Sequence, residues 1–218
     1  MKQTFVVLLL FLLSGKALFA YELVPTVVER PYAVVPMHEY LDEKYVYMGE
    51  LAGFPIMYGV DVRATTTLTL SLTQQYRGGA APTLFGVMIV RVLPDDQGVA
   101  EVARFNPLAD SWSYRKDTVL GLKLLDSTVF TKEIGPGTYR IEVNTAVNEG
   151  RYLLSIGEEH QTLGYFDTLN RVRTTQAFFG YTVFKLLNSS IVYYPLGIIL
   201  LLLLIQRTWR YRHQITHA

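Results

Sequence analysis

The sequence predicts a mainly β fold: an exported antiparallel β-sandwich or jelly roll, followed by a juxtamembrane amphipathic helix and one transmembrane helix. Three observations lead to this fold class. Short segments of alternating apolar and polar residues, separated by glycine and proline turns, fill the middle of the chain. An apolar run begins the chain, and a longer uncharged stretch lies near its end. With 218 residues, the chain has room for one ordinary domain between them.

The N-terminal segment has the layout of a secretory signal peptide, which we place at residues 1–20. Lys2 precedes an apolar run from Phe5 to Leu13, and small residues follow it. The run is too short to span a bilayer. Cleavage is expected after Ala20 or after Ala17, and an uncleaved anchor is the alternative.

Residues 21–160 are expected to form the exported sandwich. Ile56 to Val62 and Thr67 to Thr73 alternate with a period of two, as half-buried strands do. The segment from Phe85 to Val92 is apolar on both faces and predicts a central strand. A turn at Pro94 to Gly98 then predicts a hairpin with a strand that ends at Phe105.

The second half of this domain continues the same pattern. A polar loop is expected from Asn106 to Asp117, with strands at Val119 to Leu125 and Thr128 to Ile134. Tyr139, Ile141 and Val143 then alternate with polar residues, and Tyr152, Leu154 and Ile156 are expected to face inward in the last strand. These last two strands are expected to pair antiparallel.

The same segment carries a resemblance to a known family. Gly137-Thr-Tyr-Arg-Ile-Glu-Val143 followed by Gly150-Arg-Tyr-Leu-Leu-Ser-Ile156 resembles the closing hairpin of the pre-peptidase C-terminal (PPC) family of bacterial exported β-sandwich domains. By pattern, the resemblance extends over Tyr45 to Gly157. It implies a non-catalytic accessory module, of the kind often appended to secreted enzymes. This chain departs from that plan in carrying its own predicted membrane anchor.

The C-terminal part predicts the anchor. Residues 161–187 change to a helical period, and we expect an amphipathic helix on the outer leaflet, with packing on the sandwich as the alternative. Residues 188–206 are the predicted transmembrane helix, because no charged residue lies between Lys185 and Arg207 and such a length spans about 30 Å. Residues 207–218 form a short basic tail.

The residues that flank the span predict its orientation. Basic residues immediately after the span place the C-terminus in the cytoplasm, so the sandwich is expected outside the plasma membrane of a single-pass protein. Aromatic residues at both ends match the headgroup level, where tyrosine and tryptophan gather. Seven membrane-interface anchors follow from these two rules: Tyr193, Tyr194, Arg207, Trp209, Arg210, Tyr211 and Arg212.

Charge and cysteine content exclude several classes of function. The part between the signal peptide and the span holds all 19 acidic residues and 15 of the 20 basic ones, so it lacks the basic stripe that nucleic-acid binding needs. Cysteine is absent, which excludes disulfides, thiolate nucleophiles and cysteine-ligated metals. No phosphate-binding loop, dinucleotide fingerprint or serine-hydrolase elbow occurs, and no cofactor is expected.

One group of ionisable residues leaves a catalytic alternative open. His38 and Glu39, with Asp42 and Glu43 after them, are the densest such group and suggest a metal-dependent envelope hydrolase. The second histidine of a zinc-protease helix is missing, because Asp42 stands at that position. A solvated loop before a strand at Tyr45 is the simpler interpretation.

The preferred hypothesis is therefore a non-catalytic binding or accessory module, held at the outer face of the membrane. Its expected partners are the lipid bilayer and either another envelope or membrane protein or a glycan. Tyr40, Tyr45 and Tyr47 are candidates for a sugar-stacking platform, although Tyr45 and Tyr47 share one strand face and could equally fill the core. A helper protein whose span is itself the interaction surface is a third possibility.

Overall fold

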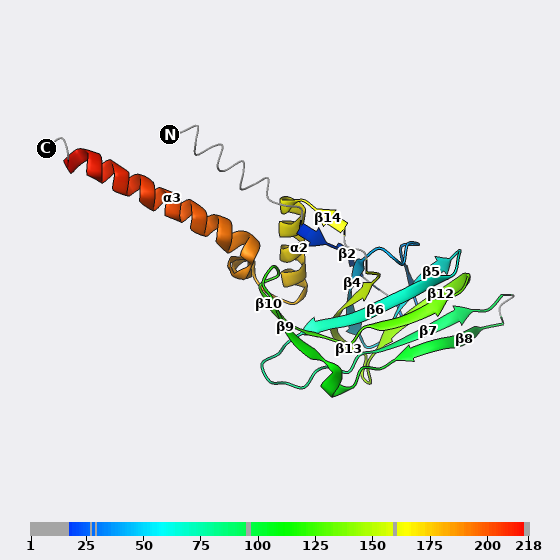
Figure 1. Ribbon diagram of the computed structural model, residues 1–218. Helices are drawn as coiled ribbons and strands as arrows, with labels where there is room; N and C mark the ends of the chain where they lie inside the picture. The colour runs from blue at the N-terminus through cyan, green and yellow to red at the C-terminus, as the bar shows by residue number, and fades with distance from the viewer. Residues whose placement is uncertain (1–17, 27, 29, 95–96, 159–160, 216–218) are drawn as a thin grey trace. The chain divides into compact units, whose positions relative to one another are not determined.

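The structure is a computed structural model that describes residues 18–26, 28, 30–94, 97–158 and 161–215 (Figure 1). The expected signal peptide lies, up to residue 17, outside the described residues, as do Asp95 and Asp96 of the expected turn. The chain divides into two compact units. The sandwich unit comprises Phe19–Lys116 and Lys123–Leu163, and the helical unit contains Asp117–Leu122 and the chain from Gly164 onward.

The strands form two large sheets and one small one (Figure 1). The first large sheet has the order β2 (Glu22–Pro25), β4 (Tyr45–Ala52), β13 (Glu149–Ile156), β6 (Thr66–Gln75), β10 (Leu122–Asp126) and β9 (Ser113–Asp117), with β11 (Phe130–Ile134) also on β6. The second has the order β3 (Val34–Pro36), β5 (Ile56–Val62), β12 (Gly137–Asn144), β7 (Gly86–Val92) and β8 (Val99–Phe105). β1 (Leu18–Ala20) pairs with β14 (Gln161–Leu163).

A smaller share of the described residues is helical. η1 (Ala109–Ser111) is a short 3-10 turn in the sandwich unit, whereas α2 (Tyr165–Phe178), η2 (Val183–Asn188) and α3 (Ser190–Ile215) belong to the helical unit. The mainly β fold class with a C-terminal apolar helix is confirmed. The sandwich is mixed rather than purely antiparallel, since β2 and β3 pair in parallel with β4 and β5.

The two large sheets share one core, as period-two alternation predicts. Every second side chain of β5 is buried, from Ile56 to Val62, and Leu68, Leu70 and Leu72 of β6 are buried on the inner face. The hydroxyl face of β6 is less open than expected, because Thr69 and Thr73 are also buried. The Thr73 hydroxyl donates to Asp126 Oδ1 at 2.7 Å, which satisfies it away from water.

A pair of tyrosines joins the two sheets at the centre of this core. The hydroxyl oxygens of Tyr58 on β5 and Tyr152 on β13 lie 3.0 Å apart, and both residues are 0% exposed. Burial raises the pKa of Tyr58 to about 12, against the opposing effect of the hydrogen bond from Tyr152. A Cβ atom at Gly49 on β4 would lie 2.4 Å from the Tyr152 hydroxyl, so only glycine leaves room for this pair.

The expected pairing of the last two strands is wrong. β12 pairs with β5 and β7, whereas β13 pairs with β4 and β6, so the two strands lie in opposite sheets. The connection turns at Asn148, whose φ is +51°, and passes from one sheet to the other at the end of the sandwich instead of closing a hairpin. Both strands bury alternate side chains in the same core, which is why the sequence pattern alone suits either arrangement.

Other expected boundaries also shift. The segment expected as a polar loop up to Asp117 contains β9. The strand expected from Val119 begins only at Leu122, because Gly121 turns the chain with a φ of +65°. The helical segment expected over 161–187 divides into β14, α2 and η2, and Gly180, with a φ of +82°, ends the helix.

Candidate functional site

The apolar helix is the first functional candidate. Within α3, Ser190–Thr208 is a stretch of 19 residues that is long and apolar enough to cross a membrane. Its leucine side chains, including Leu200, Leu201 and Leu204, are exposed rather than packed into a core. A helix that is apolar on all sides and not covered by protein matches the interior of a bilayer, and 19 residues rise about 28 Å.

All seven residues predicted as interface anchors lie on α3. Tyr193 and Tyr194 are exposed near its start, with ring centroids 4.5 Å apart. Arg207 lies on the same helix, and the side chains of residues 209–212 fall outside the described part. The rise from Tyr193 to Tyr211 is about 27 Å at 1.5 Å per residue. The geometry places the two groups one membrane thickness apart, and their role as anchors stays a prediction.

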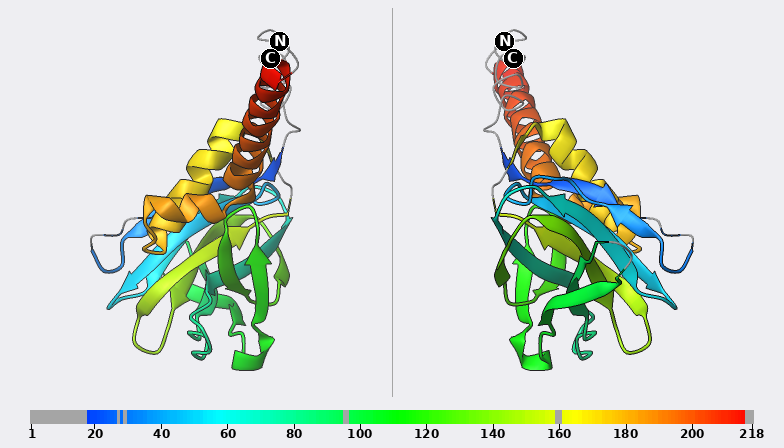
Figure 2. Two further views of the ribbon diagram at one scale, coloured as in Figure 1. Left: turned by 90° about the vertical axis from the view of Figure 1, so that its left-hand side faces the viewer. Right: turned by 90° about the vertical axis from the view of Figure 1, so that its right-hand side faces the viewer.

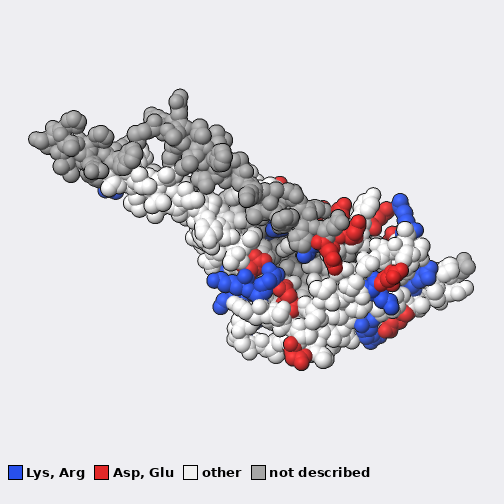
Figure 3. All heavy atoms as spheres, viewed as in Figure 1, with Lys and Arg blue, Asp and Glu red and all other residues white. Residues whose placement is uncertain are grey.

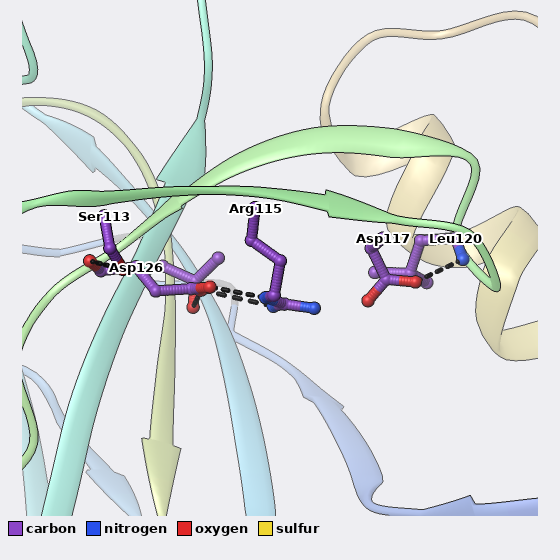
Figure 4. A network of polar contacts seen from close by, with 6 residues as sticks. Ser113, Arg115, Asp117, Leu120 and Asp126 are labelled. Atoms are coloured by element: carbon purple, nitrogen blue, oxygen red, sulfur yellow. Dashed lines mark hydrogen bonds and ion pairs between the residues drawn. The ribbon is translucent and has the colours of Figure 1, made fainter.

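The start of α3 is tied to the turn at Asp117–Leu122, which belongs to the same helical unit. The Ser189 hydroxyl donates to the Val119 carbonyl, and the Ser190 amide donates to the Thr118 carbonyl at 2.9 Å. Gln176 of α2 donates from Nε2 to the Leu120 carbonyl at 2.6 Å. The turn itself is braced by Asp117, whose Oδ1 accepts from the Leu120 amide (Figure 4).

The second candidate is one end of the sandwich unit, which we call the loop end and define as residues 76–85, 106–112 and 145–148. Three contacts show that these loops adjoin. A Cβ at Gly86 would touch Asn106 and Asn144, and a Cβ at Gly150 would touch Phe85. The first loop is pinned at its base by Gln74, whose side chain donates to the Thr83 carbonyl and accepts from the Thr83 amide, both at 2.9 Å.

The loop end exposes one large apolar side chain from each of its loops. Leu84 is 55% exposed, Leu108 is 70% exposed and Val147 is 69% exposed. The sequence does not mark these three residues, because single exposed apolar residues are common on any protein surface. Only the fold brings their loops together. Exposed apolar residues on neighbouring loops are typical of protein-binding surfaces.

The candidate catalytic side chains around His38 do not come together in one site. The His38 ring stacks on Tyr45, with centroids 4.2 Å apart, and its backbone amide donates to the Tyr47 hydroxyl. Glu39 instead forms an exposed ion pair with Arg63, and the Glu43 carboxylate accepts from the Tyr45 hydroxyl. Among the residues whose placement is described, no group of three or more histidine and acidic side chains could hold a metal ion.

The proposed sugar platform does not form as a unit either. Tyr45 and Tyr47 are buried, and Tyr47 packs against Tyr58 in the core with ring centroids 5.3 Å apart. Tyr40 is the exposed member of the three. The alternative that Tyr45 and Tyr47 fill the core is therefore the one that the structure supports.

Charged side chains are interspersed on the sandwich. On the face shown in Figure 3, acidic and basic residues adjoin one another over the strands. The Arg115 guanidinium of β9 reaches Asp126 of the neighbouring β10 with two hydrogen bonds, from Nε and from Nη2 (Figure 4). Local pairing of this kind offsets the charge of Arg115 by that of Asp126.

Together these features define a class: a mainly β sandwich protein with one C-terminal helix that is long and apolar enough to cross a membrane. The sequence matches no family model, and it matches no curated protein. The chain is similar in structure to the pre-peptidase C-terminal domain of a collagenase from Bacillus anthracis, at 16% identity and a TM-score of 0.35, over 58% of this chain and 97% of that one.

Two further solved structures are similar. One is PliG from Aeromonas hydrophila, a periplasmic inhibitor of g-type lysozyme, at 14% identity and a TM-score of 0.35, over 65% of this chain and 100% of that one. The other is a β-glucosidase from Paenibacillus barengoltzii, at 10% identity and a TM-score of 0.28, over 65% of this chain and 14% of that one. The sandwich assignment itself rests on the strand order and the shared core.

Proposed function

We propose that this chain is a single-pass, membrane-anchored, non-catalytic binding protein that presents the loop end of its sandwich to another envelope protein. The observation that carries the proposal is α3, an apolar helix whose side chains are exposed along Ser190–Thr208. Such a surface is stable in lipid and not in water. The basic residues after the span orient it with the sandwich outside the plasma membrane.

The loop end is the surface best suited to a partner. The loop end lies where β13 begins, and the sandwich unit continues beyond the other end of this strand to Leu163. An eight-residue strand is about 26 Å long. The loops that carry the exposed Leu84, Leu108 and Val147 thus lie about one strand length from the C-terminal end of β13. A protein partner suits this apolar surface better than a sugar, because the tyrosines expected to stack on a sugar are mostly buried.

The test is site-specific photo-cross-linking of the full-length protein in its native membrane. A photoreactive residue is placed at Leu108 or Val147 and, as a matched control, at Val99. Val99 is also an exposed valine, but it pairs with Val92 at the opposite end of β7. We expect one reproducible adduct from Leu108 and Val147 and none from Val99. Equal labelling at all three positions, or no adduct at the loop end, would contradict the binding role.

A further inference from the structure

A short apolar segment stands directly before the span. After Gly180 ends α2, the chain forms η2 over Val183–Asn188, and α3 begins two residues later at Ser190. In both views of Figure 2, η2 (orange) lies beside the N-terminal end of α3 and at an angle to it. η2 is therefore not the first turn of the span but a separate element at its base.

The side chains of η2 are sorted by the 3-10 period. A 3-10 helix has three residues per turn, so residues three apart share one side. Val183 with Leu186 and Phe184 with Leu187 make two apolar rows, and Lys185 with Asn188 makes the polar row. Val183 is 59% exposed, Phe184 is 77% exposed and Leu187 is 53% exposed. Two of the three sides of η2 thus present apolar side chains outward.

Hydrogen bonds within the helical unit hold η2 in this position. The Lys185 amide donates to the Thr182 carbonyl at its start, and the Ser189 amide donates to the Leu186 carbonyl at its end. Gln176 of α2 donates to the Lys185 carbonyl at 3.3 Å. The backbone of Asn188 packs so closely on Gly121 that a Cβ there would lie 2.8 Å from the Asn188 carbonyl oxygen. The exposed side chains are thus displayed by a braced backbone.

We propose that η2 is a membrane-inserted wedge, in which Val183, Phe184 and Leu187 enter the outer leaflet at the boundary between headgroups and acyl chains. The proposal rests on the proposed function, because it requires α3 to span the bilayer. Lipid is the contact because η2 is next to the span in the chain. Leu187 lies three residues before Ser190, where the apolar stretch begins, so an α3 that spans the bilayer brings η2 to the lipid surface.

Lys185, in the polar row of η2, also suits the boundary between headgroups and acyl chains. The Lys185 amino group lies over the Tyr181 ring, 4.6 Å from its centroid. Lysine at a membrane surface extends its amino group toward the lipid phosphates while its methylene chain stays in apolar surroundings. Tyrosine is likewise favoured at the headgroup level. We assign the membrane contact to η2 rather than to α2, because the exposed residues of α2 include Asp167, Asn170 and Arg173.

The experiment measures depth with nitroxide spin labels on the full-length protein in phosphatidylcholine–phosphatidylglycerol vesicles. The chain has no cysteine, so Phe184→Cys, Leu201→Cys and Val147→Cys each give one labelling site. Relaxation by oxygen, which concentrates in lipid, is compared with relaxation by a water-soluble nickel chelate. We expect the ratio of oxygen to nickel accessibility to be high at Leu201, low at Val147 and intermediate at Phe184.

The outcomes separate the two proposals. A water-like ratio at Leu201 would overturn the membrane-spanning proposal itself. A lipid-like ratio at Leu201 together with a water-like ratio at Phe184 would overturn only the wedge. Shielding of Phe184 from both reagents would also overturn it, because a protein partner or a second copy would then cover η2. Phe184 is mostly exposed, so its replacement leaves the fold intact, and Leu187→Cys provides an independent second site.

Discussion

Replacing Tyr58 by phenylalanine removes one oxygen from the centre of the sandwich and leaves the Tyr152 hydroxyl buried without its partner. The two oxygens are 3.0 Å apart and both side chains are 0% exposed. The Gly49 backbone packs closely on the end of the Tyr152 side chain and holds the hydroxyl in the core. An unsatisfied buried hydroxyl costs about 1–3 kcal/mol, and we expect Tyr58→Phe to lower the free energy of unfolding by that amount.

The double variant gives the sharper result. Tyr152→Phe in the Tyr58→Phe background removes the unsatisfied hydroxyl and leaves only two apolar rings there, so we expect stability to recover to within about 1 kcal/mol of the original protein. Tyr40→Phe, at an exposed tyrosine, is the matched control and should change stability by less than about 0.5 kcal/mol.

The assay is urea denaturation of the full-length protein in detergent micelles. Unfolding is followed by the fluorescence of Trp112, which is buried in the sandwich, in a Trp209→Phe background. If the single and double variants were equally destabilised, Tyr58 and Tyr152 would not be partners, and the packing of β5 against β13 across the core would be wrong.

Gly121, Gln74 and Tyr58 each give a further test of the structure. Gly121→Ala should weaken the junction with η2, because the new Cβ would meet the Asn188 carbonyl, and hydrogen exchange of the Ser190 amide should become faster. Gly53→Ala is the control: Gly53 also has a positive φ, but nothing lies near its Cβ position, so this substitution should leave the exchange of Ser190 unchanged. Gln74→Leu removes the side-chain hydrogen bonds to Thr83 and should make residues 76–85 more mobile, so that proteases cut there faster. Equal cleavage rates in the variant and the original protein would show that Gln74 does not hold this loop. Because the pKa of Tyr58 is raised to about 12 in the folded protein, its contribution to the free energy of unfolding is fully present below pH 10. This contribution, roughly 3 kcal/mol, is lost as the pH rises to about 12. A free energy of unfolding that stays constant over this pH range in chemical denaturation would contradict the prediction.

The sequence predicts strands better than it predicts their partners. Alternation over Ile56 to Val62 marks β5 because an inward side chain recurs every two residues, whatever strand lies beside it. The same alternation in β12 and β13 suggested a hairpin, yet the two strands belong to opposite sheets. A short connection can either pair two strands or carry the chain across the core, and the side-chain pattern is the same in both cases.

Of the three candidate functional surfaces, only the apolar helix could be predicted from the sequence. The apolar stretch before Arg207 is readable from sequence, since length and composition alone make a helix able to cross a membrane. The loop end cannot be predicted from the sequence, because Leu84, Leu108 and Val147 are far apart in the chain and only the fold brings the loops that carry them together. η2 could not be predicted as a separate element, because over six residues a period of three cannot be told from the 3.6-residue period of an α-helix.

The most direct test of the central claim is the topology of the full-length protein in intact cells. Since the chain has no cysteine, Val147→Cys in the sandwich and Gln214→Cys beyond the span each report one location to a membrane-impermeant maleimide. For cells with an outer membrane, the outer membrane is first made permeable to the reagent. We predict that Val147→Cys is labelled while the plasma membrane is intact and Gln214→Cys only after it is opened. Labelling of both sites in intact cells, or protection of Val147→Cys until the plasma membrane is opened, would contradict a single span with the sandwich outside.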